Sequence, residues 1–109
     1  MARIRKRDAA KRDLVRQWVW YAENASIEVA DRFLEAADST LATLARQPES
    51  GIRTFMTRPG LRGMRRFPVG DGFEQILLFY FPLPDGVDLV RVVHGSQNLE
   101  RLLVEGFFG

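Results

Sequence analysis

One segment near the middle of the chain, Glu74 to Phe81, is apolar on both of its sides. Its sequence, EQILLFYF, contains six consecutive apolar or aromatic residues from Ile76 to Phe81. Successive side chains of a β-strand point to opposite faces of the sheet. A strand with this pattern belongs inside a sheet that has other structure packed over at least one face. The segment therefore predicts a central strand.

Two further strands are predicted on either side of this segment, at Leu61 to Pro68 and at Val87 to His94. The connecting residues, Gly70 to Gly72 and Pro82 to Gly86, have the composition of tight turns. Successive hairpins of this kind form an antiparallel meander. The two outer strands differ from the central strand because they carry arginines.

Two amphipathic helices are predicted before the sheet. Asp8 is the expected N-cap of the first, which runs to about Glu23, and Ser26 is the expected N-cap of the second, which ends at Gln47-Pro48. Two helices with so short a connection form an antiparallel hairpin. Apolar residues recur at helical spacing along both, at Ala10, Leu14, Trp18 and Tyr21 and then at Ala30, Leu34, Ala37, Leu41 and Leu44.

Two tryptophans in the first helix are expected to face different ways. Trp18 and Trp20 are separated by about 200° around the helix, so they cannot both face one core. We expect Trp18 in the core. Trp20 is expected either on a sheet edge or in contact with a partner.

Three short segments give weaker signals. Ala2 to Lys6 has the pattern of a short first strand, and Arg53 to Met56 that of a short extended piece within a loop. Asn98 to Glu105 is expected to form a short C-terminal helix. Phe107 and Phe108 at the end of the chain either fold back over the core or belong to an interaction surface.

These elements predict an α+β fold in one domain, residues 1–109. An N-terminal antiparallel helical hairpin packs on one face of a small, curved antiparallel sheet, with a short C-terminal helix. The chain contains no cysteine, which is typical of proteins in a reducing compartment. No stretch approaches the roughly 18 apolar residues of a membrane span. We expect a cytoplasmic protein that does not enter a membrane.

The net charge of +2 conceals an uneven distribution of charge along the chain. Residues 3–16 hold seven Lys or Arg and two acids, and residues 53–66 hold five Arg and no acid. The remaining residues carry a net charge of −8. Clustered like charges repel unless a partner compensates them. The pattern favours a cationic face that binds an anionic partner over two groups of merely solvated side chains.

The residues exclude several kinds of chemistry. His94 is the only histidine, and without cysteine no multi-histidine or thiolate metal site is expected. No phosphate-binding glycine motif is present. We therefore predict no metal and no cofactor.

Arg91 and His94 are the remaining candidates for chemistry on the last strand. Simple alternation places Arg91 on one face with Leu89 and Val93, and His94 on the other unless the strand bulges. Arg91 is expected either to pair with an acid such as Glu74 or to contact a phosphate or an acidic peptide. A histidine that is satisfied at a strand end is the favoured interpretation of His94.

Taken together, these segments resemble the RelE/ParE superfamily of bacterial type II toxin–antitoxin toxins, and in particular its ParE branch of plasmid stabilisation proteins. The resemblance covers nearly the whole chain. Its most specific part is the RVVHG motif at Arg91 to Gly95. The other parts are A-x-x-DL at Ala10, Asp13 and Leu14, the aromatic run Trp18 to Tyr21, A-x-RFL at Ala30 to Leu34, Leu44-x-x-x-Pro48-x-x-Gly51, PGLR at Pro59 to Arg62, FP at Phe67 and Pro68, LLFYF at Leu77 to Phe81, and an L-x-x-LL helix at Leu99, Leu102 and Leu103.

The resemblance implies a partner and a choice of mechanisms. It implies a bacterial cytoplasmic toxin in a stable hetero-oligomer with a cognate antitoxin, whose C-terminal region wraps over the toxin. ParE-like members block DNA gyrase by binding, whereas RelE-like members cut messenger RNA on the ribosome. A toxin-derived binding module without toxicity is a third possibility. The binding mechanism is favoured because no tyrosine follows Tyr80, and beyond His94 the only titratable acids are Glu100 and Glu105.

Each mechanism implies its own residues. A ribosome-dependent endoribonuclease would use Arg62, Arg91 and His94, whereas the binding mechanism has no catalytic residue. The residues expected to contact target or antitoxin are Arg53, Arg58, Arg62, Arg65, Arg66, Arg91 and Trp20.

Overall fold

The chain folds as two helices packed on one face of a sheet. The computed structural model describes residues 2–54 and 58–95, and within them the sheet has five strands. In chain order the elements are β1 (Arg3–Lys6), α1 (Asp8–Asn24), α2 (Ile27–Arg46), the 3₁₀ turn η1 (Pro48–Ser50), β2 (Ile52–Arg53), the 3₁₀ turn η2 (Pro59–Leu61), β3 (Arg65–Pro68), β4 (Ile76–Leu83) and β5 (Gly86–His94).

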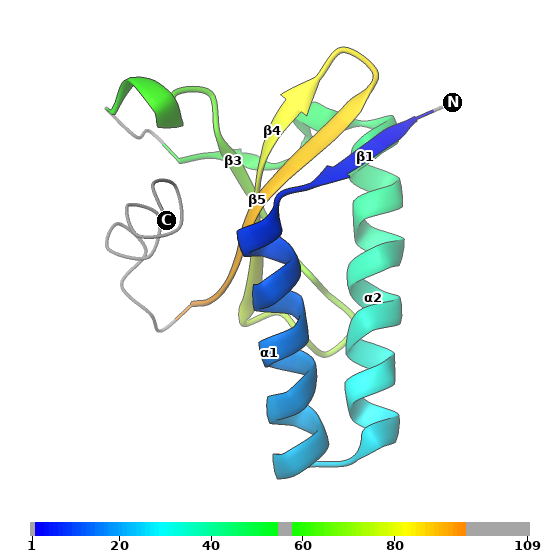
Figure 1. Cartoon of the computed structure of the whole chain (residues 1–109). Helices are drawn as coiled ribbons and strands as arrows, with labels where there is room; N and C mark the ends of the chain where they lie inside the picture. The colour runs from blue at the N-terminus through cyan, green and yellow to red at the C-terminus, as the bar shows by residue number, and fades with distance from the viewer. Residues whose placement is uncertain (1, 55–57, 96–109) are drawn as a thin grey trace.

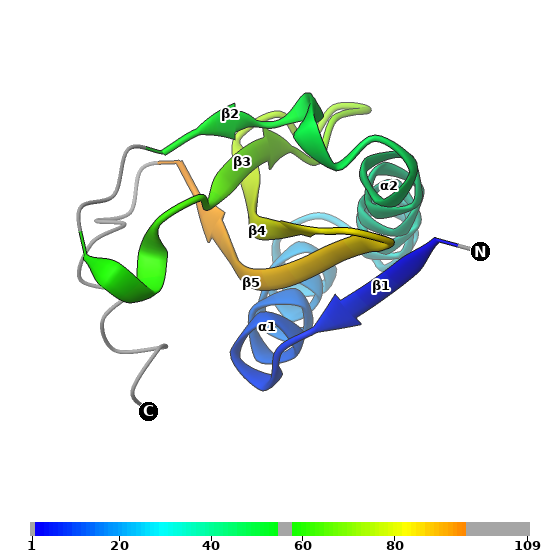
Figure 2. The ribbon, with the colours of Figure 1, turned by 90° about the horizontal axis from the view of Figure 1, so that it is seen from above.

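The strand order across the sheet is β1-β5-β4-β3-β2. The helices α1 and α2 run side by side as a hairpin with a short connection (Figure 1). Seen from above, β1 and β2 lie at opposite edges of the twisted sheet (Figure 2). The predicted α+β fold and the antiparallel β3-β4-β5 meander are confirmed. The sheet is mixed, however, because β1 pairs with β5 in parallel. The predicted helix at residues 98–105 lies outside the described residues.

The central strand is β4, as its sequence predicted. Its alternate residues Ile76, Leu78 and Tyr80 belong to the main core between sheet and helices. Phe79 points the other way, into a second core that is closed by residues of η2 and of the turn after it. The members of this second core are Leu61, Met64, Phe79, Val90 and Val93, with Leu77 and Phe81 packed against them. The sheet is therefore covered on both faces.

The turn between β4 and β5 is tighter than predicted. β4 continues through Pro82, which lies opposite Val87, so only residues 84 and 85 remain in the turn. A proline is tolerated there because the pairing of β3 with β4 reaches only as far as Tyr80, so no neighbouring strand needs the missing N–H. Gly86 has a separate role, since a Cβ there would collide with the backbone of Arg3 in β1. The sequence showed this glycine only as a turn residue.

The helix starts were predicted with different success. Asp8 is wrong as the N-cap of α1: Arg7 occupies that position without a side-chain cap, and Asp8 is the first helical residue. Ser26 is confirmed as the N-cap of α2, because its Oγ accepts a hydrogen bond of 3.1 Å from the backbone N–H of Val29. The second helix ends before Gln47, as expected.

Trp18 is not in the core, contrary to the prediction. It is half-buried at the border between the helices, where its indole Nε1 donates a 3.0 Å hydrogen bond to Asp31 Oδ1. Burial of an indole N–H requires a partner, and the carboxylate at the rim of the hairpin supplies one. The core on this side of α1 is completed by Tyr21, whose ring packs against Phe33 and Phe73.

Tyr80 fixes the segment that leaves α2. Its hydroxyl donates to the carbonyl of Pro48 at 2.7 Å and accepts from the N–H of Gly51 at 2.9 Å. A Cβ at Gly51 would collide with this hydroxyl and with the carbonyl of Arg66, which explains the glycine. Burial raises the pKa of the Tyr80 phenol above its usual value, although the Gly51 hydrogen bond and the Arg65 charge act in the opposite direction.

Strand β5 does not alternate regularly. Leu89 lies opposite Tyr80, but the next partner of β4, Phe79, lies opposite Arg91, so Val90 is an extra residue at a β-bulge. Arg91 therefore does not share a face with Leu89, although regular alternation predicted that it would. His94, at the end of the strand, lies opposite Ile76.

Candidate functional site

Arg91 is a buried residue that is held by an acid of α1. It is only 7% exposed, and its guanidinium makes a bidentate pair with Asp13, with Nε–Oδ2 and Nη2–Oδ1 distances of 2.7 and 3.0 Å. Asp13 Oδ2 also accepts a 2.9 Å hydrogen bond from the backbone N–H of Val92. The expected pairing with Glu74 is wrong. The Glu74 carboxylate instead accepts from the backbone N–H of Gly72.

The position of Asp13 follows from where β1 ends. The pairing of β1 with β5 stops at Leu89, so the rest of this edge of β5 has no neighbouring strand. α1 begins directly afterwards, and Asp13 in its second turn accepts a hydrogen bond from the N–H of Val92, which has no partner in a neighbouring strand. A buried carboxylate with three hydrogen bonds, two of them from one bidentate cation, is fully compensated. This arrangement assigns Arg91 a structural role.

A second ion pair joins the N-terminal segment to the same strand. Arg7 Nη2 lies 2.9 Å from Asp88 Oδ2, and Asp88 is buried. The Arg7 guanidinium also lies over the ring of Phe81, 5.5 Å from its centroid. Together, the Arg7–Asp88 and Arg91–Asp13 pairs fix both ends of the β1–α1 junction against β5.

The three residues of the endoribonuclease hypothesis do not share a described cavity. Arg91 lies opposite Phe79 of the second core, whereas His94 lies opposite Ile76 of the main core, so they belong to opposite faces of the sheet. Arg62 is exposed after η2. The two described cavities are lined by other residues.

Four exposed arginines lie at the corner formed by β2, β3 and η2, with Arg53 and Arg66 on opposite faces of the sheet. This arginine corner consists of Arg53, Arg58, Arg62 and Arg66. The pairing of β2 with β3 and two hydrogen bonds from Thr54, after β2, to the carbonyl of Met64, before β3, hold these elements together. Within the described part of the chain, none of the four forms an ion pair with an acid. The corner is therefore an uncompensated cationic surface, which favours an anionic partner.

Arg65 differs from its neighbours, although the sequence grouped it with them. Its Nη1 donates to the carbonyls of Glu49 and Gly51, at 3.0 and 2.7 Å. It lies opposite Tyr80, on the same side of the sheet as the helices. Arg65 therefore holds the exit of α2, and its guanidinium is already engaged.

Trp20 is available at the surface. Its side chain is 54% exposed, and its ring meets Tyr21 edge-on, with centroids 5.3 Å apart. The expectation that the two tryptophans do not both face one core is thus confirmed.

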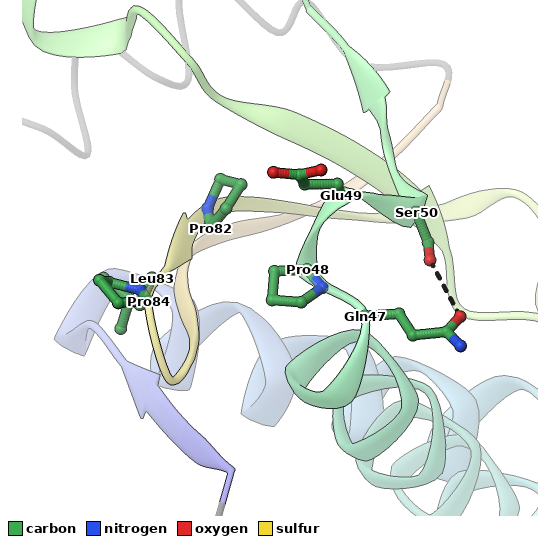
Figure 3. Close-up of a pocket in the computed structure, with 7 residues that line it drawn as sticks. All are labelled: Gln47, Pro48, Glu49, Ser50, Pro82, Leu83 and Pro84. Carbon is green, nitrogen blue, oxygen red and sulfur yellow. Dashed lines mark hydrogen bonds between the residues drawn. The ribbon is translucent and has the colours of Figure 1, made fainter.

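Two open cavities lie away from these groups. One, of about 460 Å³, lies between η1 and the β4–β5 turn, where Pro48 and Glu49 face Pro82 and Pro84 (Figure 3). The other, of about 390 Å³, lies between β1 and the helices and has Lys6 and Lys11 at its rim. Neither contains a cluster of titratable groups suited to catalysis.

The sequence pattern did not predict the roles of Arg7, Asp13 and Asp88 in the two ion pairs, Arg7–Asp88 and Arg91–Asp13. A signal was present for two of them, because Asp13 adjoins Leu14 in the helical stripe and Asp88 interrupts an apolar strand. An acid within an apolar segment needs a cation nearby. Across residues 2–54 and 58–95, no three potential metal-ligating side chains gather, and no helix is long and apolar enough to cross a membrane.

Comparisons with known proteins agree with this geometry. A chain of the chromosomal ParDE toxin–antitoxin system of P. aeruginosa superimposes with a TM-score of 0.67, covering 86% of this chain and 96% of that one. At 14% sequence identity, this likeness shows the fold alone. No curated protein matches the chain in sequence. A family model described as the ParE toxin of the type II toxin–antitoxin system parDE matches residues 4–99. The chain therefore belongs to the ParE family of type II toxin–antitoxin toxins.

Proposed function

We propose that this ParE-type toxin inhibits bacterial DNA gyrase in the cytoplasm by binding it, without catalysing a reaction, and that a cognate antitoxin neutralises it. The observation that carries the proposal is the separation of Arg91 from His94. A phosphodiester cleavage site needs its cation and its proton-transfer group beside one scissile phosphate. Here Arg91 is buried against Asp13, on the opposite face of the sheet from His94.

The arginine corner supports the antitoxin part of the proposal. Its four guanidinium groups have no acid partner among the described residues, and Arg53 lies on the short edge strand β2 next to Arg66 of β3. An acidic segment of the antitoxin would compensate them and would be held by charge-assisted hydrogen bonds. Trp20 is a second candidate contact because more than half of its indole is exposed.

A supercoiling assay tests the gyrase proposal. The purified chain is added to gyrase and relaxed plasmid, and supercoiling is expected to fall or cleaved complexes to accumulate. Addition of the product of the adjacent gene should restore activity. If gyrase is unaffected at high toxin excess and primer extension in induced cells shows cuts within codons, the endoribonuclease mechanism replaces this one. Unimpaired growth on induction would instead indicate a module without toxicity.

The antitoxin contact has its own matched test. Arg53→Glu combined with Arg62→Glu should weaken antitoxin binding at least tenfold, and should do so most at low salt. Arg16→Glu combined with Arg32→Glu, at exposed positions of α1 and α2, serves as the control because it makes the same charge change away from the corner. Equal weakening by the control would contradict a specific contact. A loss of gyrase inhibition with unchanged antitoxin binding would assign the corner to the target.

A further inference from the structure

We draw no further inference here: the strongest candidate, the outer edge of β1 together with the open cavity beside it that is lined by Ile4, Lys6, Lys11, Asp38 and Leu41, presents side chains of both charge signs, and nothing in the structure shows what covers it.

Discussion

Arginines on the two sides of this molecule have opposite roles. Arg7 and Arg91 form ion pairs with the buried carboxylates of Asp88 and Asp13. The shortest N–O distances in these pairs are 2.9 and 2.7 Å. At the arginine corner, the same kind of side chain lies exposed on short elements without an acid partner among the described residues. The first group holds the fold together, and the second is free to bind.

The difference arises from the sheet edges. The edge of β5 beyond Leu89 is closed by α1, which supplies the carboxylate of Asp13, so a cation is needed and is buried. The opposite edge, β2, has only two residues, and among the described residues no helix pairs with or covers it. Within that part of the chain no acid forms an ion pair with its arginine or with those of the neighbouring elements. The local sequence around each arginine does not contain this information, because the decisive partner comes from the other end of the chain.

Removal of Asp13 is expected to have the largest effect. Asp13→Ala leaves Arg91 buried without its counterion and Val92 without its acceptor, which should lower the free energy of unfolding by about 3–5 kcal/mol. Urea denaturation followed by circular dichroism measures the loss. The double variant Asp13→Leu, Arg91→Met should recover most of it, since no uncompensated charge remains. A loss below about 1 kcal/mol for the single variant, the range of exposed pairs, would remove the distinction between the two arginine groups.

Arg7→Ala should have a smaller effect, of about 1–3 kcal/mol on the free energy of unfolding. Asp88 would lose its partner, but the Arg7 side chain is 34% exposed, and water can reach part of the vacated space. Arg5→Ala is the matched control, because Arg5 is exposed two residues earlier, in β1, and should change stability by less than about 0.5 kcal/mol. Equal effects of the two variants would show that the pair with Asp88 contributes little.

The sequence was sufficient for the elements that depend on local periodicity. The helical hairpin, the Ser26 cap and the doubly buried β4 were predicted because their spacing is set by the residues themselves. The parallel pairing of β1 was not, since its four residues are mostly exposed and carry only Ile4 as an apolar signal. The bulge at Val90 also gives no local signal, and it moved Arg91 to the face opposite to Leu89.

The sequence predicted that arginines form the candidate site, but it did not show which of the arginines are available for binding. The absence of acids from residues 53–66 indicates a cationic segment, and none of Arg53, Arg58, Arg62 and Arg66 forms an ion pair within the described part of the chain. Nothing in that segment distinguishes Arg65 from these four. The distinction depends on Tyr80 and Gly51, which bring two carbonyls within reach of its guanidinium.

Arg65 is therefore the intermediate case, and Arg65→Ala should lower the free energy of unfolding by about 1 kcal/mol. Two hydrogen bonds from a cation to carbonyls would be lost, but the one to Glu49 is exposed, so that carbonyl can bind water instead. Thermal unfolding measures the change. Arg66→Ala, one residue along the same strand, is the control and should have no effect beyond about 0.5 kcal/mol. If the two variants agree, Arg65 belongs with the binding arginines after all.

The smallest effect on stability is expected at the arginine corner itself. Replacing Arg53, Arg58, Arg62 and Arg66 together by alanine removes no ion pair of the described residues, so the free energy of unfolding should fall by less than about 1 kcal/mol. The sign of this change depends on the salt concentration. Four neighbouring cations repel one another, so the wild-type chain should gain stability as added salt screens them, and the quadruple variant should lose this gain. Melting temperatures of both chains at low and high salt measure the difference. A loss of more than about 2 kcal/mol would mean that these arginines hold the fold as Arg91 does, and an unchanged salt dependence would contradict their mutual repulsion.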